Sequence, residues 1–316
     1  MMSEELKKLY EVAHLYYEQN QTQHQIAETL DVNRATVSRM LKRIRELGIV
    51  KFQIDYDRYQ SIDVAAQLKE RFGLKHVILV PEKSGQREET LQRMGEACAT
   101  YIGTIITDND VIGFSWGTAL AAVVEALAPK EAYSNIQCVP LIGGPDGKLE
   151  SRFHANTLAY DASRKWRGHS KLIDVPAILP NAAIKQALTQ STHAQEVAEL
   201  WGRMNIALFG IGSSQLNQET NWLAFYGQTF TEEMNDLQIV GDICSNFYNQ
   251  YGELMTTSLS DRTVHIEHQQ LAKVPLKIGV AYGSEKVEAI RVAAEHRLID
   301  VIVTTDRTAQ QLLQGE

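Results

Sequence analysis

Cysteine is scarce in this sequence, and its spacing is unlike that of a metal or disulfide framework. The three cysteines among 316 residues, Cys98, Cys138 and Cys244, lie far apart and form no CxxC pair. Neither a zinc ligand set nor a set of disulfides is indicated, so we expect buried thiols, no bound metal and no cofactor. Internal repeats and low-complexity segments are also missing.

The sequence has no segment typical of membrane insertion or secretion. Its amino terminus, MMSEELKKLYEV, mixes acidic and basic residues and lacks a long apolar core, which excludes a secretory signal. The longest apolar run, Val111 to Ala128, is interrupted by Ser115-Trp116-Gly117-Thr118 and by Glu125. That run reads as strand, turn and helix and not as a membrane span, so we expect a cytoplasmic protein without a membrane partner.

Hydrophobic residues make up 44% and charged residues 22% of the chain, values typical of soluble globular proteins. The net charge of −8 is unevenly distributed. Residues 1–56 hold eight basic and eight acidic side chains, and the rest of the chain therefore carries the whole excess of acid. From Val32 to Arg45 there are five basic residues and no acid, a local positive charge typical of a nucleic-acid contact.

The first 48 residues predict three short helices. Apolar residues spaced by three and four mark a first helix from Glu4 to Gln19. Thr22 followed by Gln25 forms a potential capping box for a second helix ending near Leu30. After a three-residue connection, a third helix begins at Asn33 or Arg34 and ends at Gly48. Two short helices joined by a tight turn, the second of them basic, are typical of a helix-turn-helix.

The rest of the chain predicts a larger α/β domain. Ile49 to Tyr56 alternates apolar and polar residues, which suggests a short strand or wing. Beyond it, an amphipathic helix (64–72) and an apolar strand (76–80) begin a series of alternating strands and helices, typical of a mostly parallel sheet covered on both faces. We therefore predict a DNA-binding domain over residues 1–56 and an effector and oligomerisation domain over residues 57–316.

In a helix-turn-helix the second helix of the motif enters the major groove, where its early residues meet base edges while flanking Lys and Arg contact phosphates. The alternative is a solvated basic helix without DNA. We favour DNA. The residues assigned to it lie at the start of the preceding helix and along the basic one: Thr22, Gln23, Asn33, Arg34, Thr36, Val37, Arg39, Lys42 and Arg43, with Lys42, Arg43 and Arg45 nearer the DNA backbone. Val37 is also expected on the buried face of that helix, with Met40, Leu41 and Ile44.

Several predicted strands end in turns whose residues suit an anion. The sequence Ser115-Trp116-Gly117-Thr118 follows one strand and opens a helix, so its hydroxyls, its glycine and the helix N-terminus could bind phosphate. This pattern alone has low specificity, because many α/β turns contain Gly and Thr for steric reasons. Comparable turns occur at residues 140–145, 207–214, 278–286 and 301–306, and the carboxyl ends of parallel strands gather at one edge of a sheet. One polar crevice is therefore predicted.

Extended motifs give this chain a resemblance to a known family. They include LYYEQNQTQHQIAETLDVNRATVSRMLKR, GFSWGTA, VPLIGGPDGKLESRFHANTL, ALFGIGS, NWLAFYG, VGDICSNFY and VTTDRTAQQLL, and they run nearly from end to end. The chain resembles the SorC family of sugar-responsive transcriptional regulators, which includes the central glycolytic and Bacillus-type deoxyribonucleoside regulators. LIGGP-x-GKLESR and NW-x-AFYG most resemble its sorbose-regulator branch, which favours a ketose or polyol effector.

The resemblance implies a homodimer or tetramer on a palindromic double-stranded DNA operator. It also implies a winged-type N-terminal motif and a Rossmann-like effector domain of the ribose-phosphate isomerase and glucosamine-phosphate deaminase type. Carried to matching positions, the residues implied to contact a sugar or sugar phosphate are Ser115, Trp116, Gly117, Thr118, Gly143, Gly144, Gly212, Asp242 and Lys286. For Asp242, a turn or helix cap is an equally good interpretation.

The alternative hypothesis is an isomerase or deaminase with a DNA-binding appendage. Ile142 offers no amine for a Schiff base in the GGP turn, and Lys148 is several residues away. Asp242, Asp306 and His154 could act as acid or base, but no pair of them has a spacing that identifies a catalytic couple. Non-covalent sensing, without catalysis, is therefore the prediction. For residues 148–154, binding the ligand and facing solvent remain equal alternatives.

Overall fold

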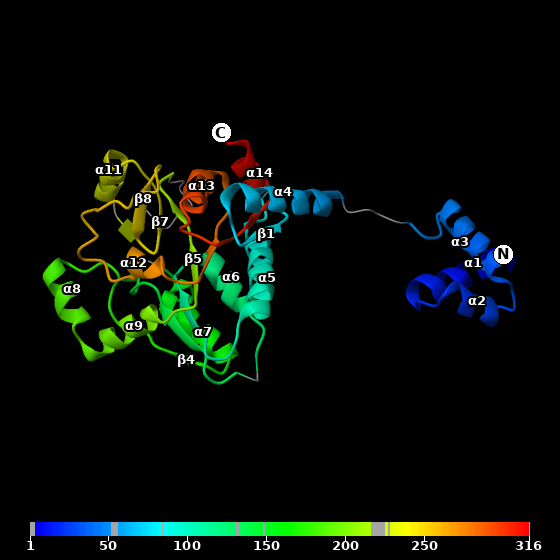
Figure 1. Cartoon of the computed structure of the whole chain (residues 1–316), viewed down its shortest axis with the longest axis horizontal. Coiled ribbons are helices and arrows are strands. Elements are labelled where there is room, and N and C mark those ends of the chain that lie inside the picture. The colour runs from blue at the N-terminus through cyan, green and yellow to red at the C-terminus, as the bar shows by residue number, and fades with distance from the viewer. Residues whose placement is uncertain are drawn as a thin grey trace. The chain divides into compact units, whose positions relative to one another are not determined.

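The computed structural model describes residues 4–51, 56–83, 85–130, 133–147, 149–215, 225–226 and 228–315. The chain divides into two compact units, Met1–Tyr59 and Gln60–Glu316, which are coloured from blue to red along the chain in Figure 1. In the part of the chain that is described, no helix is both long enough and apolar enough to span a bilayer.

The N-terminal unit contains the three predicted helices. They are α1 (Glu4–Ala13), which continues into a π-helical turn η1 (His14–Glu18), α2 (Gln23–Thr29) and α3 (Arg34–Glu46). The predicted capping box is present, because the Thr22 hydroxyl accepts from the Gln25 N–H at 3.3 Å and the Gln25 side chain accepts from the Thr22 N–H at 2.9 Å. The side chain of Asn33 caps α3 by accepting from the Thr36 N–H at 2.8 Å. A small apolar core joins the three helices: Leu9, Val12, Ala13, Ile26, Ala27, Val37, Leu41 and Ile44.

The predicted strand or wing after α3 is wrong over its described residues. Gly48 has φ +66° and ends the helix, and the Ile49 N–H then bonds back to the Ile44 carbonyl at 3.0 Å, a typical helix-terminating arrangement. Ile49 and Val50 lie in a turn, half-buried against the helical core, so their apolar side chains serve packing and not a ladder. Phe52 to Asp55 lie outside the described residues, and a helix begins at Tyr56.

The second unit is built on one seven-stranded parallel sheet. Its strands lie in the order β1 (His76–Val80), β10 (Val301–Thr305), β9 (Leu276–Val280), β5 (Ile206–Gly210), β2 (Val111–Phe114), β3 (Gln137–Pro140) and β4 (His169–Ser170). A second, antiparallel sheet contains β6 (Gly212–Ser213), β7 (Ile239–Ile243) and β8 (Asn246–Asn249). The parallel sheet confirms the predicted α/β class, whereas the small antiparallel sheet was not predicted.

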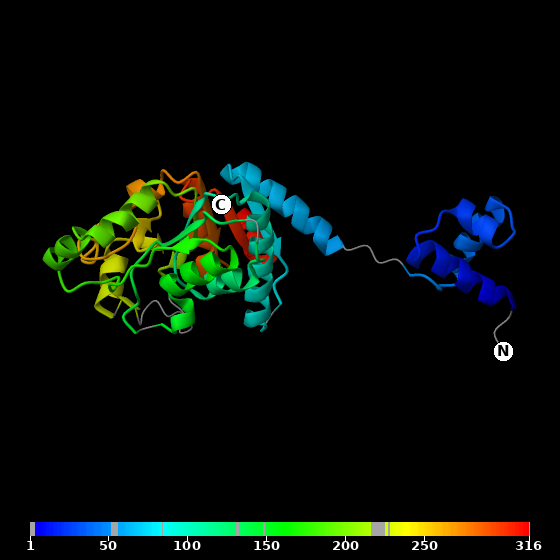
Figure 2. The same cartoon turned by 90° about the horizontal axis from the view of Figure 1, so that it is seen from below.

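Helices cover both faces of the large sheet (Figure 2). One face is packed by α4 (Tyr56–Phe72), α9 (Thr192–Gly202), α13 (Val287–Glu295) and α14 (Asp306–Gln314), and the other by α5 (Arg87–Ile105), α6 (Thr118–Ala126) and α7 (Ala155–Lys165). Side chains of β5 alternate between the two cores, since Ala207 and Phe209 join the first while Ile206 and Leu208 join the second. Other helical elements with described bounds are α8 (Ala182–Thr189), α11 (Gln228–Asp236), α12 (His268–Leu271), η2 (Ser151–Phe153) and η3 (Ser284–Lys286).

The strand order fixes where a ligand can bind. From the central pair β2 and β5, the chain proceeds outward through β3 and β4 on one side and through β9 and β10 on the other. Ligands of open α/β sheets bind beyond the carboxyl ends of the strands at such a reversal. The predicted crevice is therefore expected beside the turns that follow β2 and β5.

Candidate functional site: a polar cavity at the strand ends

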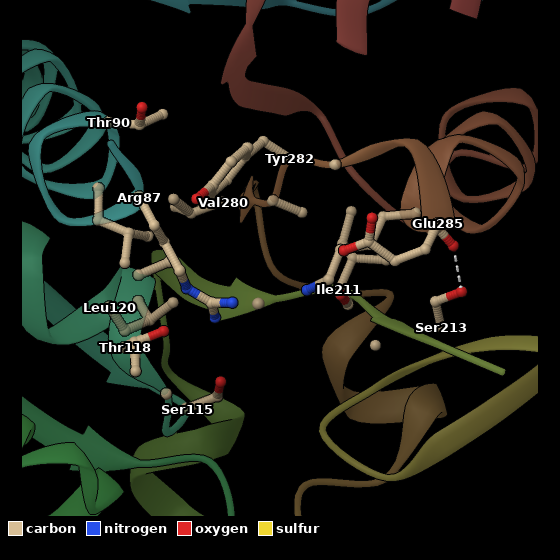
Figure 3. A pocket seen from close by; sticks show the side chains of 18 of the residues that line it. Arg87, Thr90, Ser115, Thr118, Leu120, Ile211, Ser213, Val280, Tyr282 and Glu285 are labelled. Carbon is tan, nitrogen blue, oxygen red and sulfur yellow. Dashed lines mark hydrogen bonds between the residues drawn. The ribbon is translucent and has the colours of Figure 1, made fainter. Parts of the chain in front are cut away.

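A cavity of about 640 Å³ lies at this edge of the large sheet (Figure 3). It is lined by the segments that follow β1, β2, β5 and β9, together with β7 and the first half of α14. Its volume and its mixture of apolar and polar walls are typical of small-molecule sites. Of the nine predicted effector residues, seven line this cavity: Ser115, Trp116, Gly117, Thr118, Gly212, Asp242 and Lys286.

The turn after β2 forms one side of the cavity. Gly117 has φ +124° and ψ 163° and immediately precedes α6, a conformation that essentially only glycine adopts. Ser115 is buried, and its hydroxyl donates to the Trp116 carbonyl at 3.2 Å. The Trp116 ring packs edge-on against Phe225, with centroids 4.4 Å apart. The turn therefore presents a small polar surface and the start of α6 to the cavity beside an aromatic wall.

A buried carboxylate also lines the cavity. Asp242 on β7 pairs in register with Gly212 on β6, and its Oδ2 accepts from the Ser245 N–H at 2.9 Å. Asp242 is 6% exposed, so its charge acts at short range in a poorly solvated wall. Burial, and then the Asp242 carboxylate, raise the pKa of the neighbouring Cys244 thiol well above its ordinary value. Asp242 is thus a turn cap and a cavity residue at once.

Lys286 lies in the cavity wall, at the end of η3. Its amino group donates to the Ile211 carbonyl at 2.8 Å. Burial lowers the pKa of Lys286, while the carboxylates of Glu285 and Asp242 act in the opposite direction. The predicted phosphate partner is therefore held at the turn after β5, within the electrostatic influence of two carboxylates.

The two glycines of the GGP turn lie outside the cavity lining. The N–H of Gly143 donates to the Val264 carbonyl and that of Gly144 to the Val175 carbonyl, each at 2.9 Å. A Cβ at Gly143 would lie 2.8 Å from the Val175 oxygen. These contacts explain Gly143 by the close approach of a neighbouring chain segment, and they correct its assignment to the effector.

The other chemical candidates have structural partners. The Nε2 of His154 bonds to the Leu149 carbonyl at 2.9 Å, and Asp306 accepts from the N–H groups of Glu82 and Arg307 at 3.0 and 2.7 Å. Neither His154 nor Asp306 lines the cavity. Lys148 lies outside the described residues. Within the described ranges no cluster of His, Cys, Asp and Glu is arranged to hold a metal ion.

Side chains of the segment after β1, and those of α14 beyond the predicted turn at residues 301–306, were not assigned to the site from the sequence. These two segments bring Glu82, Lys83, Arg87, Thr90, Arg307 and Gln311 to the cavity. Lys83 pairs with Glu89 at 3.0 Å. The available signal was topological, because the apolar strand at residues 76–80 had been predicted and the segment after any parallel strand reaches the same edge of the sheet.

The exposed face of α3 carries most of the predicted DNA contacts. Arg34, Arg39, Lys42 and Arg43 are exposed; the Arg39 guanidinium donates to the Thr36 hydroxyl at 3.2 Å, and Arg43 pairs with Glu5 on α1 at 3.1 Å. Such exposed ion pairs contribute little and are easily exchanged for another anion.

Val37 has to be removed from the base-facing set. It is completely buried in the helical core, because it lies on the face of α3 that packs against α1 and α2. Ser38, between Arg34 and Lys42 at four-residue spacing, is exposed on the outer face and had been overlooked. Thr22 and Gln23 lie at the start of α2, with Thr22 exposed and Gln23 half-buried.

Comparisons with known proteins agree with this architecture. Residues 57–314 match the family described as "Putative sugar-binding domain", and residues 12–57 match the MarR family. The chain is 41% identical over 312 residues to the sorbitol operon regulator of Klebsiella pneumoniae, covering 99% of both. It is 32% identical over 311 residues to the deoxyribonucleoside regulator of Bacillus subtilis, covering 96% of both. The crystal structure of full-length SorC from Klebsiella pneumoniae has a TM-score of 0.79, covering 99% of this chain and all of that one.

Proposed function

This chain belongs to the SorC family of sugar-responsive transcriptional regulators, and from that premise we propose that a sugar or polyol phosphate in the strand-end cavity controls its affinity for an operator. The relatives reported above are named as regulators and not as enzymes, in agreement with the sequence prediction. One relative is named for a sorbitol operon, so the proposed effector is a hexitol or ketohexose or its phosphate.

The proposed DNA-binding residues are the exposed side chains of α3. Arg34 and Arg39 lie in its first half, where a recognition helix meets base edges, and Lys42 and Arg43 follow where phosphates are contacted. Asn33 uses its Oδ1 as the helix cap, which leaves its amide N–H groups for DNA. The proposed target is a palindromic operator bound by a dimer or tetramer in the cytoplasm, since two-fold protein symmetry is matched by two half-sites.

The proposed effector contacts lie in the cavity at the strand ends. The observation that carries this proposal is that turns from four parallel strands, separated by up to 200 residues of sequence, line one cavity in a chain that also contains a helix-turn-helix. The start of α6 and the Arg87 guanidinium suit a phosphate. Asp242 suits hydroxyl groups, because a carboxylate accepts hydrogen bonds at both oxygens.

The helix α14 connects the cavity with α4. Arg307 and Gln311 of α14 line the cavity, and the last carbonyls of the same segment, those of Leu313 and Gly315, accept from the Arg71 guanidinium at 2.8 and 2.9 Å. Arg71 is on α4, the helix that the chain enters after the N-terminal unit. An effector that repositions α14 would therefore act on α4 directly.

A thermal-shift screen of the purified chain tests whether the chain binds the proposed effector. A ligand that binds only the native state raises the melting temperature by mass action. We expect hexitol and ketohexose phosphates to raise it and Asp242→Asn to reduce the shift. An unchanged melting temperature across sugars, polyols and their phosphates would contradict effector binding, whereas a full shift in Asp242→Asn would contradict only the assignment of that residue.

A further inference from the structure

Two turns on either side of β5 have nearly the same backbone conformation. Gly117 follows β2 with φ +124° and ψ 163°, and Gly283 follows β9 with φ +116° and ψ 147°. Both glycines immediately precede a helical segment and both line the cavity. The N–H of each is bonded within the protein, Gly117 to the Phe153 carbonyl at 3.1 Å and Gly283 to the Thr308 hydroxyl at 3.0 Å. From the backbone alone, the cavity has two similar places for an anionic group.

The space in front of the two glycines is filled differently. A Cβ built on Gly117 would meet no atom within 4 Å, so that turn opens onto unoccupied space. A Cβ built on Gly283 would lie 2.6 Å from both carboxylate oxygens of Glu285. The side chain of Glu285 therefore folds back over the glycine and places its own negative charge where a second anion would approach.

The charges around the two turns extend this difference. Figure 3 shows Arg87 reaching into the cavity on the side of Ser115 and Thr118, while Glu285 and Ser213 lie on the other side. Asp242 also lines the cavity, and the Lys286 amino group, which the charges of Glu285 and Asp242 both influence, donates to the Ile211 carbonyl. The Gly117 turn thus has a guanidinium nearby and opens a helix, whereas the Gly283 turn has the Glu285 carboxylate directly over it, and the Lys286 ammonium group is bonded to a backbone carbonyl.

We propose that Glu285 makes this cavity selective for an effector with a single phosphate, held by the Gly117 turn, and makes the Gly283 turn a reader of sugar hydroxyls. This inference rests on the proposed function. A carboxylate accepts hydrogen bonds from hydroxyls but repels a second phosphate, and an unpaired like charge is an effective way to reject a competing ligand. The effector class is then a polyol or ketose monophosphate, and a bisphosphate binds more weakly.

Isothermal titration of the full chain with matched probes tests this selectivity. The probes are sorbitol 6-phosphate, fructose 1-phosphate and fructose 6-phosphate as monophosphates and fructose 1,6-bisphosphate as their competitor. We expect at least one monophosphate to bind at least about tenfold more tightly than the bisphosphate. In Glu285→Gln, which keeps the shape of the side chain and removes its charge, this ratio is expected to fall at least about fivefold. Glu288→Gln, an equal change of charge on α13 outside the cavity lining, is the control and is expected to keep the wild-type ratio.

The outcomes separate the inference from the function on which it rests. Equal or tighter binding of the bisphosphate by the wild type, or an unchanged ratio in Glu285→Gln, would overturn the role of Glu285 while leaving effector sensing intact. An equal fall of the affinity ratio in Glu288→Gln would mean that net charge, and not the position of Glu285, causes the selectivity. This result would also overturn the proposed role of Glu285. Binding of none of the four probes, in protein whose melting transition shows it to be folded, would contradict the proposed sugar-phosphate effector and this inference with it.

Discussion

Gly117 is the residue at which the shape of the cavity depends most directly on backbone conformation. Its φ of +124° with ψ 163° is a region that side chains with a Cβ rarely enter, although no neighbouring atom would obstruct one. The turn after β2 is therefore maintained by the absence of a side chain, and a substitution there tests strain without a steric clash.

We expect Gly117→Ala to lower the free energy of unfolding by about 1–3 kcal/mol, the usual range for a residue forced into such a conformation. Gly103→Ala is the matched control, because Gly103 lies inside α5 and its Cβ would also meet nothing within 4 Å. That control is expected to stabilise by about 0.5–1 kcal/mol. Urea unfolding of both variants measures the difference, and equal effects would show that Gly117 is unstrained.

His265 predicts a pH dependence of stability. Burial lowers its pKa to about 4 from an ordinary value near 6.5, although the Cys244 carbonyl, which accepts from the ring at 2.7 Å, acts in the opposite direction. Between these two values the unfolded chain binds the proton and the native state does not. Stability is therefore expected to fall as the pH falls from about 6.5 toward 4, by about 3 kcal/mol in total from this residue.

Urea unfolding of the wild type and of His265→Gln, at about pH 7.5 and about pH 5, isolates the contribution of His265. The variant is expected to be less stable at the higher pH, because it loses the bond to Cys244, but to lose less stability on acidification. An identical pH dependence in the two proteins would mean that His265 titrates normally.

At the scale of elements, α3 has separate positions for sequence selectivity and for general affinity. Replacing both Arg34 and Arg39 by Ala is expected to abolish the preference for an operator over random DNA. Lys42→Ala is expected to weaken binding to the operator and to random DNA alike. It is also expected to reduce the slope of log affinity against log salt concentration by about one. Fluorescence anisotropy over a range of salt concentrations measures both effects. Operator preference retained in the double variant would refute the assignment of Arg34 and Arg39.

The contact between α4 and the end of α14 predicts a variant that still binds the effector but whose operator affinity responds less to it. Arg71→Gln removes the guanidinium that bonds to the Leu313 and Gly315 carbonyls, at a distance from the cavity lining. We expect it to keep effector affinity and operator affinity but to reduce the effect of one ligand on the other. Lys69→Gln, an equal change of charge at an exposed position of α4, is the control. An unchanged response in Arg71→Gln would exclude this route.

The helices and strands also show which features of the fold can be predicted from the sequence. Periodicity and caps predicted α2 and α3 almost to the residue, because local hydrogen bonds such as that of Thr22 determine where a helix starts. The strand expected after Gly48 is absent over its described residues, because the adjacent apolar side chains of Ile49 and Val50 pack on the helical core. The exclusion of Gly143 from the cavity and the approach of Arg87 depend on contacts between distant segments, which no local pattern encodes.

For the molecule as a whole, the distribution of charge along the sequence predicted which unit would bind DNA and which would hold the effector cavity. It predicted less well which side chains lie at each site. The acid-free stretch from Val32 to Arg45 indicated the DNA-binding face, yet Val37 within it is buried. The acidic remainder forms an α/β unit in which seven of nine predicted effector residues line one cavity. A charged helix and a polar cavity lie in one chain, and the proposed function requires that ligand binding at the two be thermodynamically coupled.

Operator affinity measured with and without effector tests that coupling most directly. Anisotropy of a labelled palindromic operator, titrated with the full chain at fixed salt in the presence and absence of a saturating hexitol or ketohexose monophosphate, gives the two dissociation constants. We expect the two constants to differ by about 5- to 150-fold, the range of ordinary allosteric coupling. Identical constants, with an effector shown by titration to be bound, would contradict it.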